Sequence, residues 1–394
     1  MMKRLGLYVH FPFCLNKCAY CDFYSVVGYK NIDDYIDALM LQCDDYSTAV
    51  SSYAVDSVFF GGGTPSIVPE KYMLEFIDRV YDKFNVTVDA EFTMEANPAT
   101  VKASQLKKYR KAGVNRLSLG VQSACNSELS ALGRIHTFED FQKSFDIARN
   151  AGFDNINIDL MYGIPEQTFE SFCGTLKRIV ELNPEHISLY NLKIEDSTPF
   201  GAKKDTLPLP SEDDEYKMYE YAIEFLSNHG YNQYEISNFA KPGKECVHNL
   251  KYWTCAEYLG LGTAAHSYFR NTRFSFIRNL DKFINAVKDL NDETNITDEN
   301  YTINPEERVG EYIMLSLRLT QGINTLEFER VFGMDFEKMF SELLPAYLEN
   351  GFMKKTSVGY AFTTKGMYVS NYILSSMLDF SSPIDENIAN GSDK

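Results

Sequence analysis

The sequence predicts an α/β protein, with a partial (β/α)6 barrel of the TIM type followed by a C-terminal helical, winged-helix-like domain. Six short runs rich in β-branched and aromatic residues alternate with amphipathic helical patterns. Six successive βα units imply a parallel sheet with right-handed crossovers. Glycine-rich or polar residues follow nearly every run. A barrel carries functional groups around one rim in this way, whereas a doubly wound sheet gathers them at one switch point.

The predicted strands take up the apolar runs in chain order. They cover residues 5–10, 55–60, 91–95, 116–121, 155–161 and 186–192. Gly113 and Gly152 follow the ends of two of the intervening helices, and Pro69 opens another, which has an apolar face of Leu74, Ile77 and Tyr81. Six strands are too few to close a standard eight-stranded barrel, so we expect a lateral opening suited to a large substrate.

The pattern changes beyond residue 273, which suggests two domains. We assign residues 1–273 to the barrel core and the segment after it, and residues 274–384 to the C-terminal domain, with a polar linker at about 291–304. Residues 385–394 read as a polar, disordered tail. A strand pair at 353–355 and 361–363, joined through Gly359, completes the winged-helix-like module. We expect this module to cover the open side of the barrel or to dock a partner.

Composition and charge exclude several classes of partner. Of the 394 residues, 44% are apolar and 24% charged, as in ordinary globular proteins. The formal net charge of −17 argues against nucleic acid or an anionic membrane as the main partner. The C-terminal module is unsuited to DNA because it carries Glu306, Glu307, Glu311, Glu327 and Glu329.

The sequence shows no signal sequence and no apolar segment of about 20 residues, and its cysteines are mostly isolated. The protein is therefore expected to be cytoplasmic.

Three cysteines directly after the first predicted strand are the most informative feature of the sequence. Cys14, Cys18 and Cys21 suit three corners of a [4Fe-4S] cluster, whereas clusters that only carry electrons usually take four cysteines. The open corner suits the amino and carboxylate groups of S-adenosylmethionine (SAM). The alternative is a structural zinc site with His10 as fourth ligand. Zinc sites usually pair their ligands across a longer gap, and no second pair follows at a usable distance.

A run of three glycines follows the second predicted strand. Gly61, Gly62 and Gly63 let backbone groups approach a ligand closely, such as the amino group of a bound amino acid. The alternative is a tight strand-to-helix turn. A phosphate-binding P-loop is excluded because no Gly-Lys-Ser/Thr follows.

Several motifs in one order resemble the radical SAM proteins related to oxygen-independent coproporphyrinogen III oxidase (HemN). The resemblance covers most of the chain, including its C-terminal part. It rests on YVHFPFC at 8–14, the cysteine spacing, GGGTP at 61–65, EANP at 95–98, SLGVQS at 118–123 and DLMYGIP at 159–165. A radical SAM core, a HemN-type C-terminal domain, a [4Fe-4S] cluster and SAM are what this resemblance implies. An electron donor such as flavodoxin is implied if SAM is cleaved.

The resemblance also implies roles for individual residues. The cluster ligands would be Cys14, Cys18 and Cys21, with Tyr8 as an aromatic side chain nearby. The methionine end of SAM would be held by Gly62, Gly63 and Thr64. Further polar contacts to SAM would come from Glu95, Gln122, Arg134 and Asp159. Carboxylates can bond ribose hydroxyls or an amino group, and a guanidinium pairs with a carboxylate. Taken singly, Glu95 or Arg134 would more often belong to a structural ion pair.

Two departures from the oxidase pattern favour a different branch of the family. The oxidase has a further cysteine where this chain has Phe23, and an N-terminal extension, whereas the first strand here begins almost at Met1. Both departures resemble the heme-chaperone branch, as does the segment at 248–253, which matches a His-Asn-x-x-Tyr-Trp motif of that branch. The residues of this possible heme contact are His248, Asn249, Tyr252 and Trp253.

The chemistry of the segment at 248–253 allows two interpretations. A neutral imidazole can ligate heme iron, and Tyr and Trp rings offer flat faces for a porphyrin. Alternatively, the segment packs and hydrogen-bonds within the barrel mouth, with His248 as a satisfied polar residue. Cys246 or His266 is a further candidate for the iron ligand in place of His248. Residues 260–265 match a dinucleotide-binding spacing but stand outside a βαβ unit. We interpret them as a close-packed turn that carries His266 toward the cavity.

Two functions follow from these observations. In the first, the protein is a heme chaperone that carries heme or a porphyrin as cargo to heme-accepting proteins, including membrane-associated ones, and retains the cluster and SAM. In the second, it is an oxygen-independent coproporphyrinogen III oxidase that uses a 5'-deoxyadenosyl radical in heme biosynthesis. The missing cysteine at Phe23 favours the first.

Overall fold

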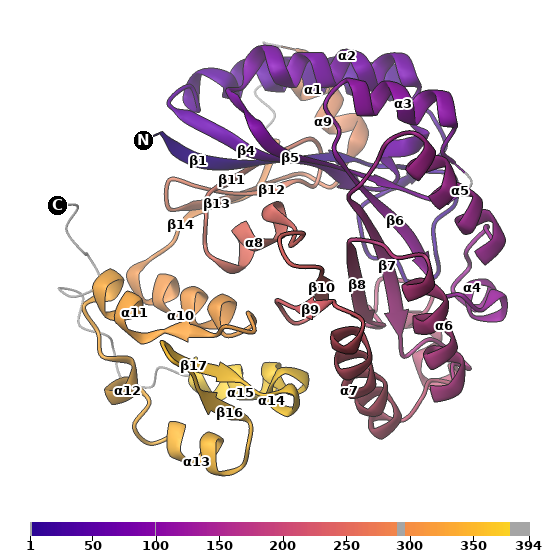
Figure 1. Cartoon of the computed structure of the whole chain (residues 1–394). Helices are drawn as coiled ribbons and strands as arrows, with labels where there is room; N and C mark the ends of the chain where they lie inside the picture. Colours follow the sequence, from indigo (N-terminus) through magenta and orange to yellow (C-terminus); the bar gives the residue numbers. More distant parts are fainter. Residues whose placement is uncertain (1, 99, 290–295, 379–394) are drawn as a thin grey trace.

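One curved sheet forms the body of the protein (Figure 1). The computed structural model describes residues 2–98, 100–289 and 296–378. Six neighbouring parallel strands of this sheet confirm the predicted partial barrel. They are β1 (Lys3–Phe11), β4 (Tyr53–Gly62), β5 (Val86–Ala96), β6 (Arg116–Gln122), β7 (Ile156–Tyr162) and β8 (His186–Asn191). All seven residues of β6 are buried, as expected for a parallel strand covered on both faces.

The sheet extends beyond the predicted barrel at both edges, to twelve strands in the described residues. A seventh parallel strand, β11 (Tyr258–Leu261), pairs with β1. Antiparallel strands follow it in the order β12 (His266–Phe269), β13 (Thr272–Phe276) and β14 (Thr297–Thr302), and the other edge is formed by β10 (Asn238–Ala240) and β9 (Asn232–Gln233). These strands were not predicted because two to six residues give too little periodicity.

Strands β13 and β14 bear on the predicted division into domains. The boundary at residue 273 falls inside β13, and the predicted linker at 291–304 contains β14, which pairs with β13. The main sheet therefore continues to Thr302. The division itself stays a prediction, and the tail at 385–394 lies outside the described residues.

Helices cover the convex side of the sheet (Figure 1). They are α1 (Ile32–Ala49), α2 (Glu70–Lys83), α3 (Ala103–Lys111), α4 (Asn126–Ala131), α5 (Phe138–Asn150), α6 (Phe169–Glu181) and α7 (Glu212–Asn228). Gly113 and Gly152 have positive φ just after α3 and α5, as predicted. The predicted apolar face of α2 is correct at Ile77 and in part at Leu74, which is half-buried and packs against the core, but the fully buried stripe is Met73, Phe76, Ile77 and Val80. Tyr81 is 43% exposed.

The C-terminal module packs helices on a three-stranded sheet. Its elements are α10 (Pro305–Ser316), β15 (Ile323–Asn324), α11 (Thr325–Phe332), α12 (Phe336–Met339), α13 (Leu344–Glu349), β16 (Met353–Lys355), β17 (Gly359–Phe362), α14 (Thr364–Tyr368) and α15 (Ser370–Met377). The rings of Phe328, Phe332, Phe336 and Phe340 contact one another in tilted and edge-to-face arrangements in its core. The module contacts the body through Arg273, whose guanidinium donates two hydrogen bonds to Glu311 of α10.

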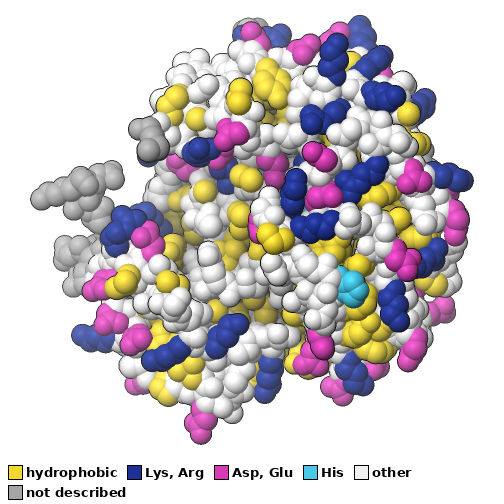
Figure 2. Space-filling model, viewed as in Figure 1, with side chains coloured by type: hydrophobic (Ala, Val, Ile, Leu, Met, Phe, Trp, Pro, Cys, Tyr) yellow, Lys and Arg dark blue, Asp and Glu magenta, His cyan; other side chains and the backbone are white. Residues whose placement is uncertain are grey.

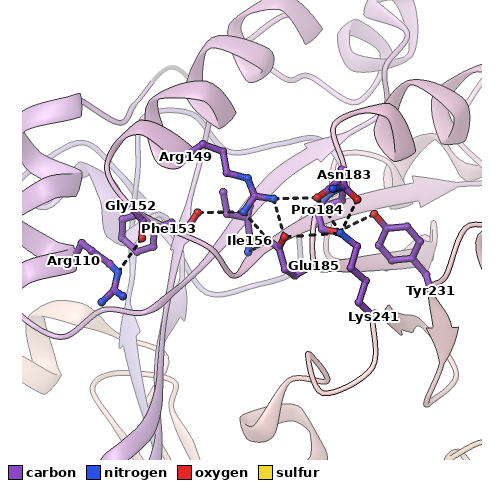
Figure 3. Close-up of polar contacts among 10 residues, drawn as sticks. All are labelled: Arg110, Arg149, Gly152, Phe153, Ile156, Asn183, Pro184, Glu185, Tyr231 and Lys241. Carbon is purple, nitrogen blue, oxygen red and sulfur yellow. Dashed lines mark hydrogen bonds and ion pairs between the residues drawn. The ribbon is translucent and has the colours of Figure 1, made fainter.

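The amino ends of β7 and β8 are fastened by one polar network (Figure 3). Arg149 at the end of α5 donates two hydrogen bonds to Glu185, at 2.7 and 3.0 Å. The same carboxylate accepts the backbone N–H of Ile156 at 3.0 Å. Lys241 and Arg149 both donate to the carbonyl of Asn183. This end of the barrel is therefore closed by structural contacts, which leaves the carboxyl ends for a site.

Surface charges are mixed on the face drawn in Figure 2, where Lys and Arg side chains lie among Asp and Glu side chains. Among the described residues no helix has the length and apolar character required to cross a membrane.

Candidate functional site

A cavity of about 470 Å³ lies at the carboxyl ends of the parallel strands. The strands contribute Tyr8 and His10 from β1, Gly62 from β4, Glu95 from β5, Ser118 from β6, Asn157 and Asp159 from β7, and Ser188 and Tyr190 from β8. The short helix α8 (Val247–Trp253), on the concave side of the sheet in Figure 1, contributes His248, Asn249 and Tyr252. The predicted rim of functional groups is therefore present.

The three cysteines lie in the loop that follows β1. Cys14 ends the short strand β2 (Phe13–Cys14), which pairs with β3 (Val26–Val27), and Cys18 and Cys21 follow in the loop between them. All three are half-buried free thiols. The Cys14 Sγ lies 3.6 Å from the Thr64 hydroxyl, and the Cys18 Sγ lies 3.5 Å from the Arg134 guanidinium. The loop thus sits against the glycine turn and the predicted arginine.

The glycine turn after β4 is packed too closely for side chains. Gly62 has a φ of +104°, and a Cβ there would lie 2.5 Å from the His10 ring. A Cβ on Gly63 would lie 2.7 Å from the Phe13 carbonyl oxygen. The backbone N–H of Gly63 donates to the Phe11 carbonyl, and that of Thr64 to the Phe13 carbonyl, each at 2.8 Å. The turn is held rigidly beside the cysteine loop.

Two carboxyl groups face the cavity. Glu95 accepts the Gly62 N–H at 3.2 Å, while Asp159 accepts from the Ser118 hydroxyl at 2.9 Å and from the Asn157 amide at 2.8 Å. Burial, then the neighbouring Asp159 carboxylate, raise the pKa of Glu95 to about 8. Glu95 is therefore protonated at neutral pH and can donate a hydrogen bond.

Arg134 has an unsatisfied donor beside the cysteines. Its Nη2 donates to Asn97 Oδ1 at 2.9 Å and to the Gly120 carbonyl at 2.5 Å. Its Nε is buried and has no hydrogen-bond partner. A buried guanidinium N–H without a partner fits an incoming carboxylate. Gln122, predicted as a SAM contact, is buried with a φ of +74° and lies outside the residues that line the main cavity.

His10 is not placed as a zinc ligand. One ring nitrogen lies 3.0 Å from the Tyr8 hydroxyl and the other 2.9 Å from the Tyr24 carbonyl. Among the described residues, no three His, Cys, Asp or Glu side chains are arranged to hold a single metal ion. The three thiolates of a cubane each bind a different iron, so this finding concerns a mononuclear site alone.

His248 is held from both sides. It is 1% exposed. Its Nδ1 lies 3.0 Å from the Ser57 hydroxyl and its Nε2 lies 3.0 Å from the Tyr252 hydroxyl. Burial, then the positive charge of Lys251, lower the pKa of His248 to about 3. This geometry favours the interpretation of His248 as a satisfied polar residue, and the heme role of the segment stays a prediction.

The other predicted heme contacts differ in position. Asn249 and Tyr252 line the cavity, whereas Trp253 is half-buried and outside its lining. Cys246 is fully buried, and its thiol donates to Glu91, which also accepts two backbone N–H groups at the start of α8.

His266 lies at the mouth of the cavity, as the sequence predicted. It is exposed, and it follows a turn in which a Cβ on Gly262 would lie 2.2 Å from the Tyr35 hydroxyl. The close-packed turn is therefore confirmed. A buried strand, β11, precedes the turn, but an antiparallel strand and no helix follows, so the turn lies outside a βαβ unit, as predicted.

Sequence reasoning missed several residues of the cavity. Arg116 and Ser188 lie in its wall, and Phe23, Tyr24 and Arg278 lie at its mouth. Arg116 begins β6, and two-residue alternation along the strand could have placed it inside the barrel. No local signal marks Arg278, because its position depends on strands that were not predicted.

Comparison with known proteins identifies the class first. The radical SAM superfamily model matches residues 8–179, and the HemN C-terminal domain model matches residues 303–369. The solved structure of coproporphyrinogen III oxidase (HemN) from Escherichia coli superimposes with a TM-score of 0.84 at 25% identity, covering 96% of this chain and 91% of that one. The fold is thus that of a radical SAM protein, and the chain carries the radical SAM domain.

Full-length relatives narrow the family further. The heme chaperone HemW of Bacillus subtilis is 34% identical over 94% of this chain and 98% of its own length. HemW of Lactococcus lactis is 33% identical over 96% and 98%. HemW of Escherichia coli is 41% identical over 67% of this chain and 70% of its own length. The chain belongs to the HemW family of radical SAM proteins, a membership that implies SAM and a [4Fe-4S] cluster.

Proposed function

We propose that this protein binds heme and delivers it to acceptor proteins, and that it holds a [4Fe-4S] cluster and SAM at the carboxyl ends of its parallel strands. The observation that carries the proposal is its similarity to heme chaperones HemW along nearly the whole chain. Phe23 at the mouth, where the oxidase has a cysteine, supports the same function.

The residues near the cysteine loop fit the two cofactors. Cys14, Cys18 and Cys21 are the cluster ligands, with Tyr8 beside the cavity. The methionine end of SAM is held by Gly62, Gly63 and Thr64, and its polar groups by Glu95, Gln122, Arg134 and Asp159. The unpartnered Nε of Arg134 and the close-packed glycine turn support this assignment. When bound, the two cofactors supply one-electron reductive chemistry.

Glu95 and the guanidinium of Arg134 supply hydrogen bonds with which the protein would bind the polar groups of SAM. A protonated Glu95 can donate a hydrogen bond and an oxygen of the Asp159 carboxyl can accept one, so the pair can bind both hydroxyls of a ribose. The Arg134 guanidinium is anchored by Asn97 and Gly120, which aims its remaining N–H groups toward a carboxylate.

Anaerobic hemin titration followed by transfer tests the function. We expect the purified protein to bind hemin stoichiometrically, with a shifted Soret band. We expect it to transfer this hemin to apomyoglobin, a model acceptor, faster than serum albumin releases its bound hemin. A protein that binds no hemin, or binds it and never releases it to apomyoglobin, contradicts the proposal.

A second candidate function is supported by the structural match to HemN. Incubation of the reconstituted protein with coproporphyrinogen III, SAM and a reductant under argon separates the two functions. We expect no loss of carbon dioxide from the propionates. Catalytic decarboxylation would favour an oxidase and contradict the chaperone function.

The proposed partners follow from the proposed function. They are heme-accepting proteins, including membrane-associated ones, and an electron donor such as flavodoxin if SAM is cleaved. The net charge of −17 disfavours nucleic acid.

A further inference from the structure

We propose that His266, at the mouth of the cavity, ligates the heme iron, with Phe23 against the macrocycle and Arg278 toward a propionate. The proposal rests on the heme-binding function proposed above and names the residues that would perform it.

The hydrogen-bonding of the cavity histidines leads to His266. The sequence contains six histidines, and three of them line the cavity. Both ring nitrogens of His10 and both of His248 lie within 3.0 Å of hydrogen-bond partners. His266 is exposed, and among the described cavity residues it is the histidine whose ring makes no hydrogen bond. It can offer a free nitrogen lone pair to iron without breaking any existing contact.

The backbone places His266 firmly while leaving its ring free. The preceding Ala265 donates its N–H to the Gly262 carbonyl at 3.2 Å, and Phe276 donates to the Ala265 carbonyl at 3.0 Å. His266 itself pairs with Ser275 in the register of β12 and β13. The Cα position is therefore fixed by the sheet, and the side chain projects from it into the mouth of the cavity.

The missing partner of the His266 ring suits a protein that releases its cargo. Metal-ligating histidines usually donate their second ring N–H to a carboxylate or carbonyl, and loss of that partner typically weakens metal affinity by about 10- to 100-fold. His266 has no such partner. A heme held by this imidazole would be less tightly bound than one in a resident heme site, which permits transfer.

The surroundings of His266 match the rest of a heme molecule. Phe23 is 69% exposed at the same mouth, so the face of its ring is available to a flat apolar ligand. Arg278 is exposed and uses Nη2 to bond the Asp22 carbonyl at 2.8 Å, which leaves its other N–H groups for a carboxylate. An imidazole, an aromatic face and a guanidinium thus converge where heme presents iron, a flat ring and propionates.

The size of the cavity places the macrocycle at the mouth. The lining of this space of about 470 Å³ includes Gly62, Glu95 and Asp159, three of the residues proposed to hold SAM. A porphyrin that entered as far as His248 would compete with SAM for that space. It would also have to separate His248 from Ser57 and Tyr252. A heme at His266 leaves both in place.

Hemin titration of three variants, followed by absorbance and electron paramagnetic resonance, tests the proposal. We expect His266→Ala to lose about tenfold or more in hemin affinity, equivalent to ~1.4 kcal/mol, and to change the Soret position and the ferric spin state. Added imidazole should restore the wild-type spectrum of His266→Ala. His229→Ala, an exposed histidine at the end of α7, is the matched control and should behave as wild type.

Iron-free protoporphyrin IX separates the ligand from the rest of the site. Because it has no iron to ligate, its affinity should be unchanged in His266→Ala and several-fold weaker in Phe23→Ala. Protoporphyrin IX dimethyl ester, which has no carboxylates, should bind wild type and Arg278→Gln equally. Together, the three ligands test His266 against the iron, Phe23 against the macrocycle and Arg278 against the propionates.

The possible failures are distinct. If wild type binds no hemin, the proposed function fails and this inference fails with it. If wild type binds hemin but His266→Ala keeps its affinity and spectrum, the function stands and His266 is not the ligand. Loss of the spectrum in His248→Gln, with His266→Ala unchanged, would transfer the role to the segment at 248–253.

Discussion

A single buried imidazole shows how environment decides what a residue can do. His248 belongs to the motif that most strongly suggested an iron ligand, yet Ser57 of β4 and Tyr252 of α8 hold both of its nitrogens. Its pKa of about 3 keeps the ring neutral at any pH at which the protein is handled. A sequence motif identifies the residue types. Whether His248 has a free nitrogen lone pair depends on its hydrogen-bond partners, one of which, Ser57, lies 191 residues earlier in the chain.

Glu95 predicts a specific pH dependence of stability. Its folded-state pKa of about 8 lies above the ordinary value of 4.5, so the folded state retains a proton that the unfolded state loses. The contribution of Glu95 is therefore most favourable below about pH 4.5 and declines as the pH rises through 8, by up to about 1.4 kcal/mol per pH unit. Urea denaturation of the cofactor-free protein should show a flatter profile for Glu95→Gln than for wild type between pH 5 and 8.

The exposed Glu342→Gln serves as the control for this measurement, since a surface carboxylate should leave the profile unchanged. Parallel profiles for wild type and Glu95→Gln would mean that Glu95 is ionised in the folded state.

Arg134 predicts a loss of SAM affinity. Arg134→Gln removes the guanidinium that bonds Asn97 and Gly120. The free energy of SAM binding should therefore weaken by ~1.5–3 kcal/mol, the range for a hydrogen bond to a charged group. Anaerobic calorimetry with the reconstituted protein measures it, with iron and sulfide quantified in the same sample because Arg134 also contacts Cys18. Arg330→Gln on α11 is the control. Wild-type affinity with full cluster content would remove Arg134 from the SAM site.

At the scale of elements, the strength of the sequence signal determined what could be predicted. The six long strands were recovered, because each is a run of buried residues flanked by clear turn signals. The strand β11 was missed because it has four residues and directly follows α8. The face of α2 was misassigned because residues 74, 77 and 81 and residues 73, 76, 77 and 80 both have helical spacing, and only tertiary packing distinguishes adjacent stripes.

The same limit explains the site. Residues in contiguous motifs, such as Gly62 and Glu95, were predicted to lie together and do. Phe23, Tyr24 and Arg278 were not, because their meeting depends on β12 and β13 folding back beside β11. Long-range register of short antiparallel strands has no local signature.

The glycine turn predicts opposite effects of one substitution at two positions. Gly63→Ala would place a Cβ against backbone atoms of Phe11 and Phe13 and should lower the free energy of unfolding by ~1–3 kcal/mol. Gly174→Ala, within α6 and with no atom within 4 Å of the added Cβ, should raise it by about 0.5–1 kcal/mol. Thermal denaturation of both variants measures the difference. Equal melting temperatures would show that the turn can relax.

At the scale of the whole molecule, several contacts join the C-terminal module to the body, among them the antiparallel bridge between Leu319 and Glu235 and two side-chain joints. Arg273 of β13 pairs with Glu311 of α10, and the Tyr368 hydroxyl of α14 donates to the Glu212 carbonyl at the start of α7. The two joints lie on opposite edges of the sheet, since β13 is near one edge and α7 leads to β9 at the other. The module therefore spans the opening between the edges, as Figure 1 shows.

The Arg273–Glu311 pair gives a prediction for this joint. The two hydrogen bonds measure 2.6 and 2.8 Å, and both side chains are about one quarter exposed, at 24% and 22%. Glu311→Gln should lower the free energy of unfolding by roughly 1–2 kcal/mol, less than for a fully buried pair. Fluorescence of Trp253, the single tryptophan, reports the transition from α8.

Glu349→Gln, an exposed carboxylate on α13, is the matched control for Glu311→Gln. A double-mutant cycle with Arg273→Gln that gives no coupling energy would show that the pair contributes nothing to the joint.

The loop after the third cysteine links two regions that the chain otherwise separates. Arg278 bonds the Asp22 carbonyl at 2.8 Å, and the backbone N–H of Leu280 bonds the Tyr24 hydroxyl at 2.7 Å. Asp22 follows Cys21 directly, so any shift of the connection between β13 and α9 (Leu280–Lys288) pulls on the peptide next to a thiolate. The proposed heme site and the proposed cluster are therefore connected through one short loop, so hemin binding should alter the magnetic resonance spectrum of the reconstituted cluster.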